Sequence, residues 1–193
     1  MPTDTPDHLN NIERALIDTL RSGSYNTTAG IGSGAAWASG NVTVFGQFPT
    51  TDETKYPCII TEMVANGIET QFMGQKLTNN AGSAALGELY GVGFNIYLMV
   101  DRDSSLTITN TTSTGSVAQP YKERRLLNYL MLNSANILID CDFSGITKGG
   151  AGTPAATEID ERHFSGFKEI GYNPQLETWV AVASLVVVFK NSR

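Results

Sequence analysis

The residue types that most often carry catalysis or bind metals are few in this chain and stand far apart. There are two histidines and two cysteines among 193 residues. His8 lies in a predicted first helical turn, and His163 lies among charged residues at a predicted strand edge. None of the short spacings that bind zinc is present, because Cys58 and Cys141 also stand alone. We therefore predict that the chain binds no metal and needs no cofactor.

Two weaker patterns could still indicate a catalytic or phosphate-binding site. Cys141 and His163 could form a nucleophile and its base, but no family signature surrounds the cysteine. The glycine-rich runs Gly30–Gly34 and Gly149–Gly152 resemble phosphate loops, yet neither ends in Gly-Lys followed by Ser or Thr. Buried free thiols and flexible connectors explain these residues better, and we expect no enzyme activity.

The paired carboxylates Asp101/Asp103 and Asp140/Asp142 are the remaining candidates for chemistry. On an extended strand, each pair would project from one face and could share a divalent cation. Two ligands are too few for such a site. Asp101 and Asp103 also follow a predicted strand, where such residues commonly cap a turn. Turn capping is therefore the better interpretation of this pair.

The overall composition is that of an acidic globular protein. Charged residues make up 17% of the chain, against roughly 25% in typical soluble proteins, and the net charge is -6. This charge repels phosphates, so specific nucleic-acid binding is not expected. The opening residues lack the features of a signal peptide, and the longest apolar run, Trp179–Phe189, is about half of a membrane span. We expect neither export nor membrane insertion.

Two segments have the periodicity of amphipathic helices. The first has apolar residues at spacings of three and four and is predicted to end near Ser22. Its apolar positions are Leu9, Ile12, Leu16 and Leu20. Pro120 suits the first turn of the second helix. The stripe of the second helix comprises Leu126, Leu127, Leu130, Met131 and Ser134.

The clearest strand pattern runs from Tyr90 to Val100, where apolar side chains alternate with a mixed set. This alternation predicts a central strand whose even-numbered residues face the core and both helices. Asn66-Gly67 is a strong turn signal and predicts a hairpin between the strands 58–64 and 68–73. A second turn, at Asn173-Pro174, should lead into the last strand. The other predicted strands are 41–48, 137–143, 159–172 and 177–190.

Three insertions rich in glycine, serine and threonine interrupt this pattern, at about 23–40, 103–119 and 144–157, and we expect long irregular loops there. The segment Asp101–Gln119 should project from the body and stay mobile until a partner orders it, because its few apolar side chains cannot offset the lost entropy. The order of helix, strands, helix and strands predicts one α+β domain over residues 1–193. Its antiparallel or mixed sheet should carry both helices on one face.

Several segments resemble those of tail terminator, or tail completion, proteins of tailed bacteriophages. In that family a Tyr-Pro pair precedes one strand, and a later strand carries a Gly-Glu pair and an isoleucine. Tyr56-Pro57 corresponds to the first feature, and Gly87, Glu88 and Ile96 correspond to the second. The first helix, the YKERRLLNYLM helix and the closing WVAVASLVVVF strand extend the resemblance over most of the chain outside the insertions.

The resemblance implies a structural virion protein without enzyme activity, cofactor or membrane contact. Such a protein forms a ring, usually of six subunits, that caps the finished tail tube and joins it to the neck. Its partners would be copies of itself, the tail tube protein and neck or head-closure proteins, and the insertions could also contact a sheath. DNA would pass through without specific binding, past an inner rim that we expect to be neutral or acidic. The protein would be found in the tail or neck of the virion after assembly in the host cytoplasm.

A ring that closes head to tail must use two different surface patches. Arg124 and Arg125 on the second helix and Asp101 and Asp103 at a strand end carry opposite charges and could meet across neighbouring subunits. Contacts within one subunit are equally open. The alternative structural roles are a head-closure protein, another neck protein or a tail-tube subunit. A carbohydrate- or receptor-binding module is the alternative from another class, suggested by the polar loops and Trp37.

Overall fold

The computed structural model describes residues 8–22, 24–25, 28–29, 35–36, 42–50, 54–64, 69–78, 84–112, 115–140 and 158–192. The elements in chain order are α1 (His8–Ser22), β1 (Ser24–Tyr25), β2 (Thr28–Ala29), β3 (Ala35–Ala36), β4 (Thr43–Phe45), β5 (Cys58–Met63), β6 (Glu69–Thr78), β7 (Ala84–Asp101), β8 (Ser105–Thr112), β9 (Gly115–Lys122), α2 (Glu123–Asp140), β10 (Glu158–Phe164), β11 (Lys168–Asn173) and β12 (Thr178–Ser192).

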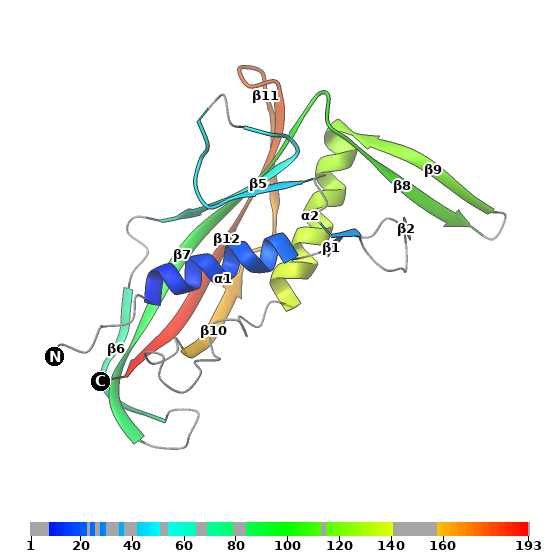
Figure 1. Cartoon of the computed structure of the whole chain (residues 1–193). Helices are drawn as coiled ribbons and strands as arrows, with labels where there is room; N and C mark the ends of the chain where they lie inside the picture. The colour runs from blue at the N-terminus through cyan, green and yellow to red at the C-terminus, as the bar shows by residue number, and fades with distance from the viewer. Residues whose placement is uncertain are drawn as a thin grey trace.

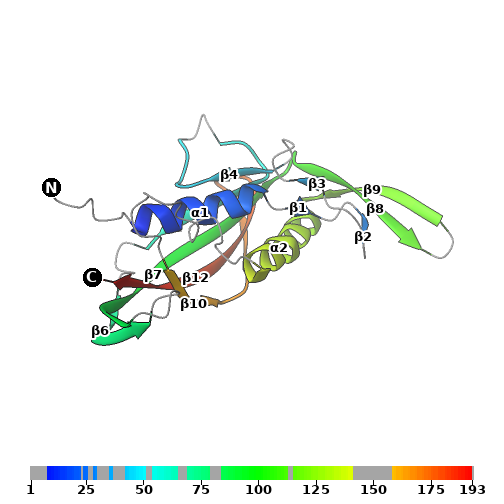
Figure 2. The same ribbon diagram turned by 60° about the horizontal axis from the view of Figure 1, so that its bottom comes forward.

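A seven-stranded mixed sheet forms the body of the molecule, in the order β10-β12-β7-β5-β4. Strand β11 also pairs with β12, and β6 also pairs with β7. The pairs are antiparallel except for β4 with β5, which is parallel. Helices α1 and α2 lie across one face of this sheet (Figures 1 and 2). The predicted α+β class, with a mixed sheet and both helices on one face, is therefore confirmed.

Strand β7 is the central strand, as its alternation predicts. It pairs with β12 from Gly87–Ser192 to Asp101–Thr178 without a register shift. Its even-numbered side chains from Val92 to Val100 are almost fully buried and belong to the main core. The predicted orientation of this strand is thus confirmed, and the strand is longer than its apolar pattern indicates.

The two helices complete the main core from the same side. Ile12, Leu16 and Leu20 of α1 are fully buried, and α1 ends at Ser22 as predicted. The buried stripe of α2 comprises Leu126, Leu127, Leu130, Ser134 and Leu138. On the opposite face of the sheet, a smaller cluster contains Cys58, Ile60 and Met99.

The predicted hairpin at Asn66-Gly67 is wrong as a pairing of strands. Strands β5 and β6 do not pair with each other, since both pair with β7. Val64 N–H donates to the Gly93 carbonyl over 2.9 Å, and Glu69 then pairs with Gly91. The chain therefore resumes along the same partner strand instead of turning back on β5. Residues 66 and 67 lie outside the described residues.

The second helix begins and ends later than its pattern predicts. Pro120 belongs to β9, where it lies opposite Thr107 in an edge strand that tolerates a missing N–H. The predicted strand 137–143 is also wrong over its first half, because α2 continues to Asp140. Leu138 is buried and extends the helical stripe by one further turn, which explains why these residues stay helical.

The segment Asp101–Gln119, predicted as a mobile loop, contains most of an antiparallel hairpin of β8 and β9. This correction has a packing reason, because Leu106 and Ile108 are buried in the main core at the base of the hairpin. Their threonine neighbours favour extended backbone. The hairpin does project from the body, as expected (Figure 1).

The remaining insertions and strands differ from expectation in smaller ways. Within 23–40 the described residues form the short strands β1, β2 and β3, of which β1 pairs with β3 and β2 pairs with β8. The insertion at 144–157 lies outside the described residues. The predicted strand 159–172 is two strands, β10 and β11, because the chain bends at Gly166, whose φ is 75°. The turn at Asn173 is confirmed, since its Oδ1 accepts N–H bonds from Gln175 and Leu176.

Candidate assembly interface

The four charged residues predicted at an interface lie at one end of the molecule, the upper end in Figure 1. Asp101 is the last residue of β7, and Asp103 follows it before β8 begins. Arg124 and Arg125 lie in the first turn of α2, directly after β9. Because the β8–β9 hairpin leaves and returns here, the end of β7 and the start of α2 come close in space.

The acidic pair behaves as turn-forming residues. The Asp101 carboxylate accepts a hydrogen bond from the Ser104 N–H at 2.8 Å and another from the Ser104 hydroxyl. Ser104 is buried, so Asp101 satisfies polar groups that water cannot reach. Asp103 is exposed. The turn-capping interpretation thus fits Asp101, while Asp103 remains available at the surface.

The two arginines make contacts within their own subunit. The Arg124 Nε lies 3.0 Å from the Glu169 carboxylate and ties α2 to β11. The Arg125 guanidinium lies 4.0 Å from the centre of the Tyr121 ring and 3.4 Å from the Gln119 side-chain oxygen. Both arginine side chains are exposed, so each contact adds at most about 1 kcal/mol. Neither contact prevents an additional partner from binding the outer side of the guanidinium.

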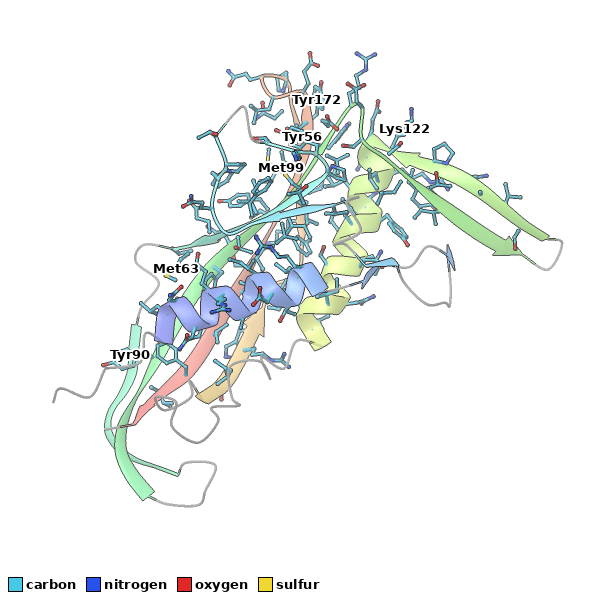
Figure 3. The ribbon with its side chains drawn as sticks, in the orientation of Figure 1. Tyr56, Met63, Tyr90, Met99, Lys122 and Tyr172 are labelled. Carbon is cyan, nitrogen blue, oxygen red and sulfur yellow. The ribbon has the colours of Figure 1, made fainter. Side chains whose placement is uncertain are left out.

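A surface hollow of about 450 Å³ lies at this same end. The described residues that line it are Arg102, Glu123, Tyr172 and Trp179. The Tyr172 and Trp179 rings are inclined at 55° with their centres 5.4 Å apart, and so form an aromatic wall. Figure 3 shows Tyr172 near Lys122 at this end, above Tyr56 and Met99. Sequence reasoning missed this hollow because its residues come from four separate segments.

Large apolar side chains are exposed on the hairpin that contributes Tyr172 to the aromatic wall. Ile170 is 64% exposed, Tyr172 47% and Leu176 48%. All three come from β11 and the turn that follows it, so these exposed apolar side chains lie on the surface of one hairpin. We call this surface, together with the hollow, the end surface. The sequence signal that could have indicated this surface is the presence of large apolar residues in a strand whose side chains are not part of the core.

Two residues at the end surface have left-handed backbone conformations that disfavour residues other than glycine. Glu123, at the start of α2, has φ of 48°, and Glu177, just before β12, has φ of 50°. Such conformations cost roughly 1 kcal/mol or more each and often occur where structure is constrained by function. Glu123 also lines the hollow. The backbone strain therefore coincides with the end surface.

The other candidates for chemistry are not brought together among the described residues. Cys58 is buried as a free thiol, and Cys141 lies outside the described residues. His163 lies 3.2 Å from Glu161 on the exposed strand β10. In the described ranges, no group of three or more His, Cys, Asp or Glu residues could hold a metal ion. Asp140 is the last residue of α2 rather than part of a strand, and Asp142 lies outside the described residues.

Comparison with protein-family models and with curated proteins finds no match for this chain. Among the described helices, none is long and apolar enough to cross a lipid bilayer.

The Cys58 thiol gives the protein a specific sensitivity to alkaline pH. Burial, together with the smaller effect of the nearby Asp101 carboxylate, raises the pKa of this thiol from 9.0 to about 12. The unfolded chain loses the proton above about pH 9 while the folded protein keeps it, so stability should fall by about 1.4 kcal/mol per pH unit up to the folded pKa. Below pH 9 both states keep the proton, and this effect disappears.

We expect urea unfolding to show this loss in a comparison with Cys58→Ala. Between pH 8 and pH 10.5 the wild-type free energy of unfolding should fall by about 2 kcal/mol more than that of the variant. The packing lost in Cys58→Ala is the same at both pH values and cancels. Identical pH dependence in the two proteins would show that Cys58 ionises as readily in the folded state as in the unfolded one.

Proposed function

We propose that this chain is a structural subunit that joins copies of itself head to tail into a ring. Within this proposal the ring is a tail terminator of a tailed bacteriophage, usually of six subunits, that caps the tail tube and connects the tail to the neck. The end surface is the observation that carries the proposal. It combines an apolar centre, an aromatic hollow and a charged rim, and this is the anatomy of protein–protein interfaces.

The residue roles in the proposal follow from position. Tyr172 and Ile170 supply the apolar centre that a neighbouring subunit would cover. Arg125 and Asp103 lie at the rim, where charges steer association more than they strengthen it. Arg124 already forms an ion pair with Glu169 of its own subunit, and a neighbouring subunit would add a second contact to this arginine. Asp101 would contribute by holding the turn that presents Arg102 to the hollow.

The phage assignment rests on the resemblance, and the fold is compatible with it. Tyr56-Pro57, joined by a cis peptide bond, directly precedes β5, as the family pattern implies. Gly87, Glu88 and Ile96 all lie in the central strand β7. In this role the partners are the tail tube protein, neck or head-closure proteins and a sheath where one exists. DNA passes through without specific binding, and the protein is located in the virion after assembly in the host cytoplasm.

The aromatic hollow also favours one function of a different class, binding of a carbohydrate. Sugars pack their C–H faces on aromatic rings, and Arg102 and Glu123 could hydrogen-bond the hydroxyl groups. In this alternative, Tyr172→Ser abolishes the binding of a saccharide probe and leaves the mass of the particle unchanged. In the ring proposal the same change alters the mass.

We expect the double variant Ile170→Ser/Tyr172→Ser to assemble poorly. Truncation of aromatic residues at interface centres costs about 2 kcal/mol or more, so the concentration needed for half-maximal ring formation should rise by about thirtyfold. Both side chains are exposed, so the melting temperature should change little. Sedimentation velocity over a dilution series measures the shift.

Val117→Ser is the matched control for this experiment, because Val117 is 56% exposed but lies on β9, away from the hollow. It should assemble like the wild type. Rings of the Ile170→Ser/Tyr172→Ser variant at wild-type concentrations would remove the end surface from the proposal. Charge reversal of Arg125 should give a smaller loss, consistent with a position at the rim.

A further inference from the structure

The hollow at the end surface contains two charges of opposite sign that the subunit does not neutralise. Arg102 and Glu123 both line it. Among the described residues, neither side chain takes part in an ion pair, either with the other or with a third group. The hollow therefore presents a cation and an anion together. A ligand that covers both without leaving a charge unpaired must itself carry both charges.

The neighbouring arginines at the start of α2 leave the Glu123 carboxylate available. Arg124 forms its ion pair with Glu169, and Arg125 lies over the Tyr121 ring. Neither arginine lines the hollow. Glu123 also has a left-handed backbone conformation, with φ of 48°, and such disfavoured conformations are frequent at binding sites. Glu123 is therefore the anion that the hollow offers to a ligand.

The aromatic wall indicates the kind of cation that fits beside Glu123. The rings of Tyr172 and Trp179 are inclined at 55° to each other, so their faces point in two directions. The face of an aromatic ring attracts organic cations, and Trp and Tyr are the strongest such rings. A quaternary ammonium group donates no hydrogen bond and is held by ring faces and a carboxylate alone. The wall and Glu123 together supply both.

Arg102 supplies the complementary site for an acid group. It lies in the turn after β7, which is held by the hydrogen bond from the Ser104 N–H to the Asp101 carboxylate. A guanidinium binds a carboxylate through two parallel N–H donors. The hollow has a volume of about 450 Å³, within the range of about 300–1,000 Å³ that is typical of small-molecule sites.

We propose that the hollow binds a small zwitterion, in which a quaternary ammonium group contacts Tyr172, Trp179 and Glu123 and a carboxylate contacts Arg102. A neutral saccharide, the ligand of the alternative function, would leave both charges unmatched. The inference does not depend on the ring. In a protein that forms rings, the ligand would lie at the contact between subunits.

Fluorescence of Trp179 tests this proposal directly. The chain has two tryptophans, so the substitution Trp37→Phe leaves Trp179 as the only reporter. The probe is γ-butyrobetaine, a trimethylammonium group joined to a carboxylate by a short alkyl chain, titrated into dilute protein that sedimentation shows to be monomeric. We expect a saturable change with a dissociation constant of about 0.1 to 1 mM. Tetramethylammonium, which lacks the acid group, should bind about tenfold more weakly.

Charge variants in the Trp37→Phe background assign the two ends of the ligand. Glu123→Gln should weaken the binding of both γ-butyrobetaine and tetramethylammonium by about tenfold. Arg102→Gln should weaken only γ-butyrobetaine, to the level of tetramethylammonium, because it removes the partner of the acid group. Glu161→Gln and Arg162→Gln are the matched controls, since both residues are exposed on β10 and do not line the hollow. Circular dichroism melting checks that each variant is folded.

Three results would overturn the proposal. One is the absence of a saturable fluorescence change with γ-butyrobetaine. Another is an equal loss of affinity for both cations in Arg102→Gln and in its control Arg162→Gln, which would indicate a general effect of net charge. The third is a neutral saccharide probe that binds more tightly than γ-butyrobetaine. Loss of ring formation in the native protein, with zwitterion binding intact, would speak only against the ring.

Discussion

Phe94→Ala is expected to lower the free energy of unfolding by about 3 to 5 kcal/mol, among the largest effects of any single change in this protein. Phe94 is only 1% exposed and lies in the middle of β7, between β5 and β12. Its removal leaves a cavity between the sheet and the helices, and strands paired on both sides cannot collapse to fill it. Thermal or urea unfolding measures the loss.

Asn95→Ser is the matched control for Phe94→Ala, because it changes the neighbouring residue on the opposite face of the sheet. Asn95 is only partly buried, and its side-chain oxygen accepts a 3.4 Å hydrogen bond from the exposed Ser184. This change should cost well under 1 kcal/mol. Equal losses in the two variants would contradict the assignment of the even-numbered residues of β7 to the core.

Ile108→Ala is the second change with a large expected effect, about 2 to 4 kcal/mol of lost stability. Ile108 is fully buried in the main core, although it belongs to the β8–β9 hairpin. The hairpin is therefore anchored by its base, and shortening this side chain weakens the anchor and the core together. Equilibrium unfolding gives the total loss, and hydrogen exchange of the β8 amides shows whether the hairpin opens first.

Thr107→Ala should be nearly neutral by comparison, because Thr107 is exposed on the other side of the same strand. Its cost should stay within about 0.5 kcal/mol. If Ile108→Ala were as mild as Thr107→Ala, residues 105–112 would behave as the irregular loop that their polar composition suggests, and the hairpin would not be part of the folded core.

The elements that sequence predicts well are those in which one face is strongly apolar. The alternation from Tyr90 to Val100 predicts β7 because a strand with one buried face has a period of two. The stripe of Leu9, Ile12, Leu16 and Leu20 predicts α1 for the equivalent helical reason. In both elements, local pattern and final burial agree.

The failures arise where partners distant in sequence decide the structure. Asn66-Gly67 is a strong local turn signal, but β5 and β6 both pair with β7, which is longer than either strand. The polar segment 105–112 becomes a strand because Leu106 and Ile108 reach the core. No local property of these residues shows that the core extends to that place.

The candidate site is predictable only in part for the same reason. Sequence indicates Asp101, Asp103, Arg124 and Arg125 as charged positions near element ends, and the fold brings them to one end of the molecule. The hollow between Arg102, Glu123, Tyr172 and Trp179 requires the ends of β7, β11, β12 and the start of α2 to converge. That convergence follows from strand order, which the sequence pattern does not determine.

The native mass of the purified protein, measured alone and after mixing with tail tubes, tests the central claim most directly. The account predicts a closed ring, usually of six subunits, together with capping of tube ends in electron micrographs. The Ile170→Ser/Tyr172→Ser variant should lose both properties while remaining folded. A wild-type protein that stays a monomer or a simple dimer at high concentration, and leaves tube ends bare, would contradict the ring.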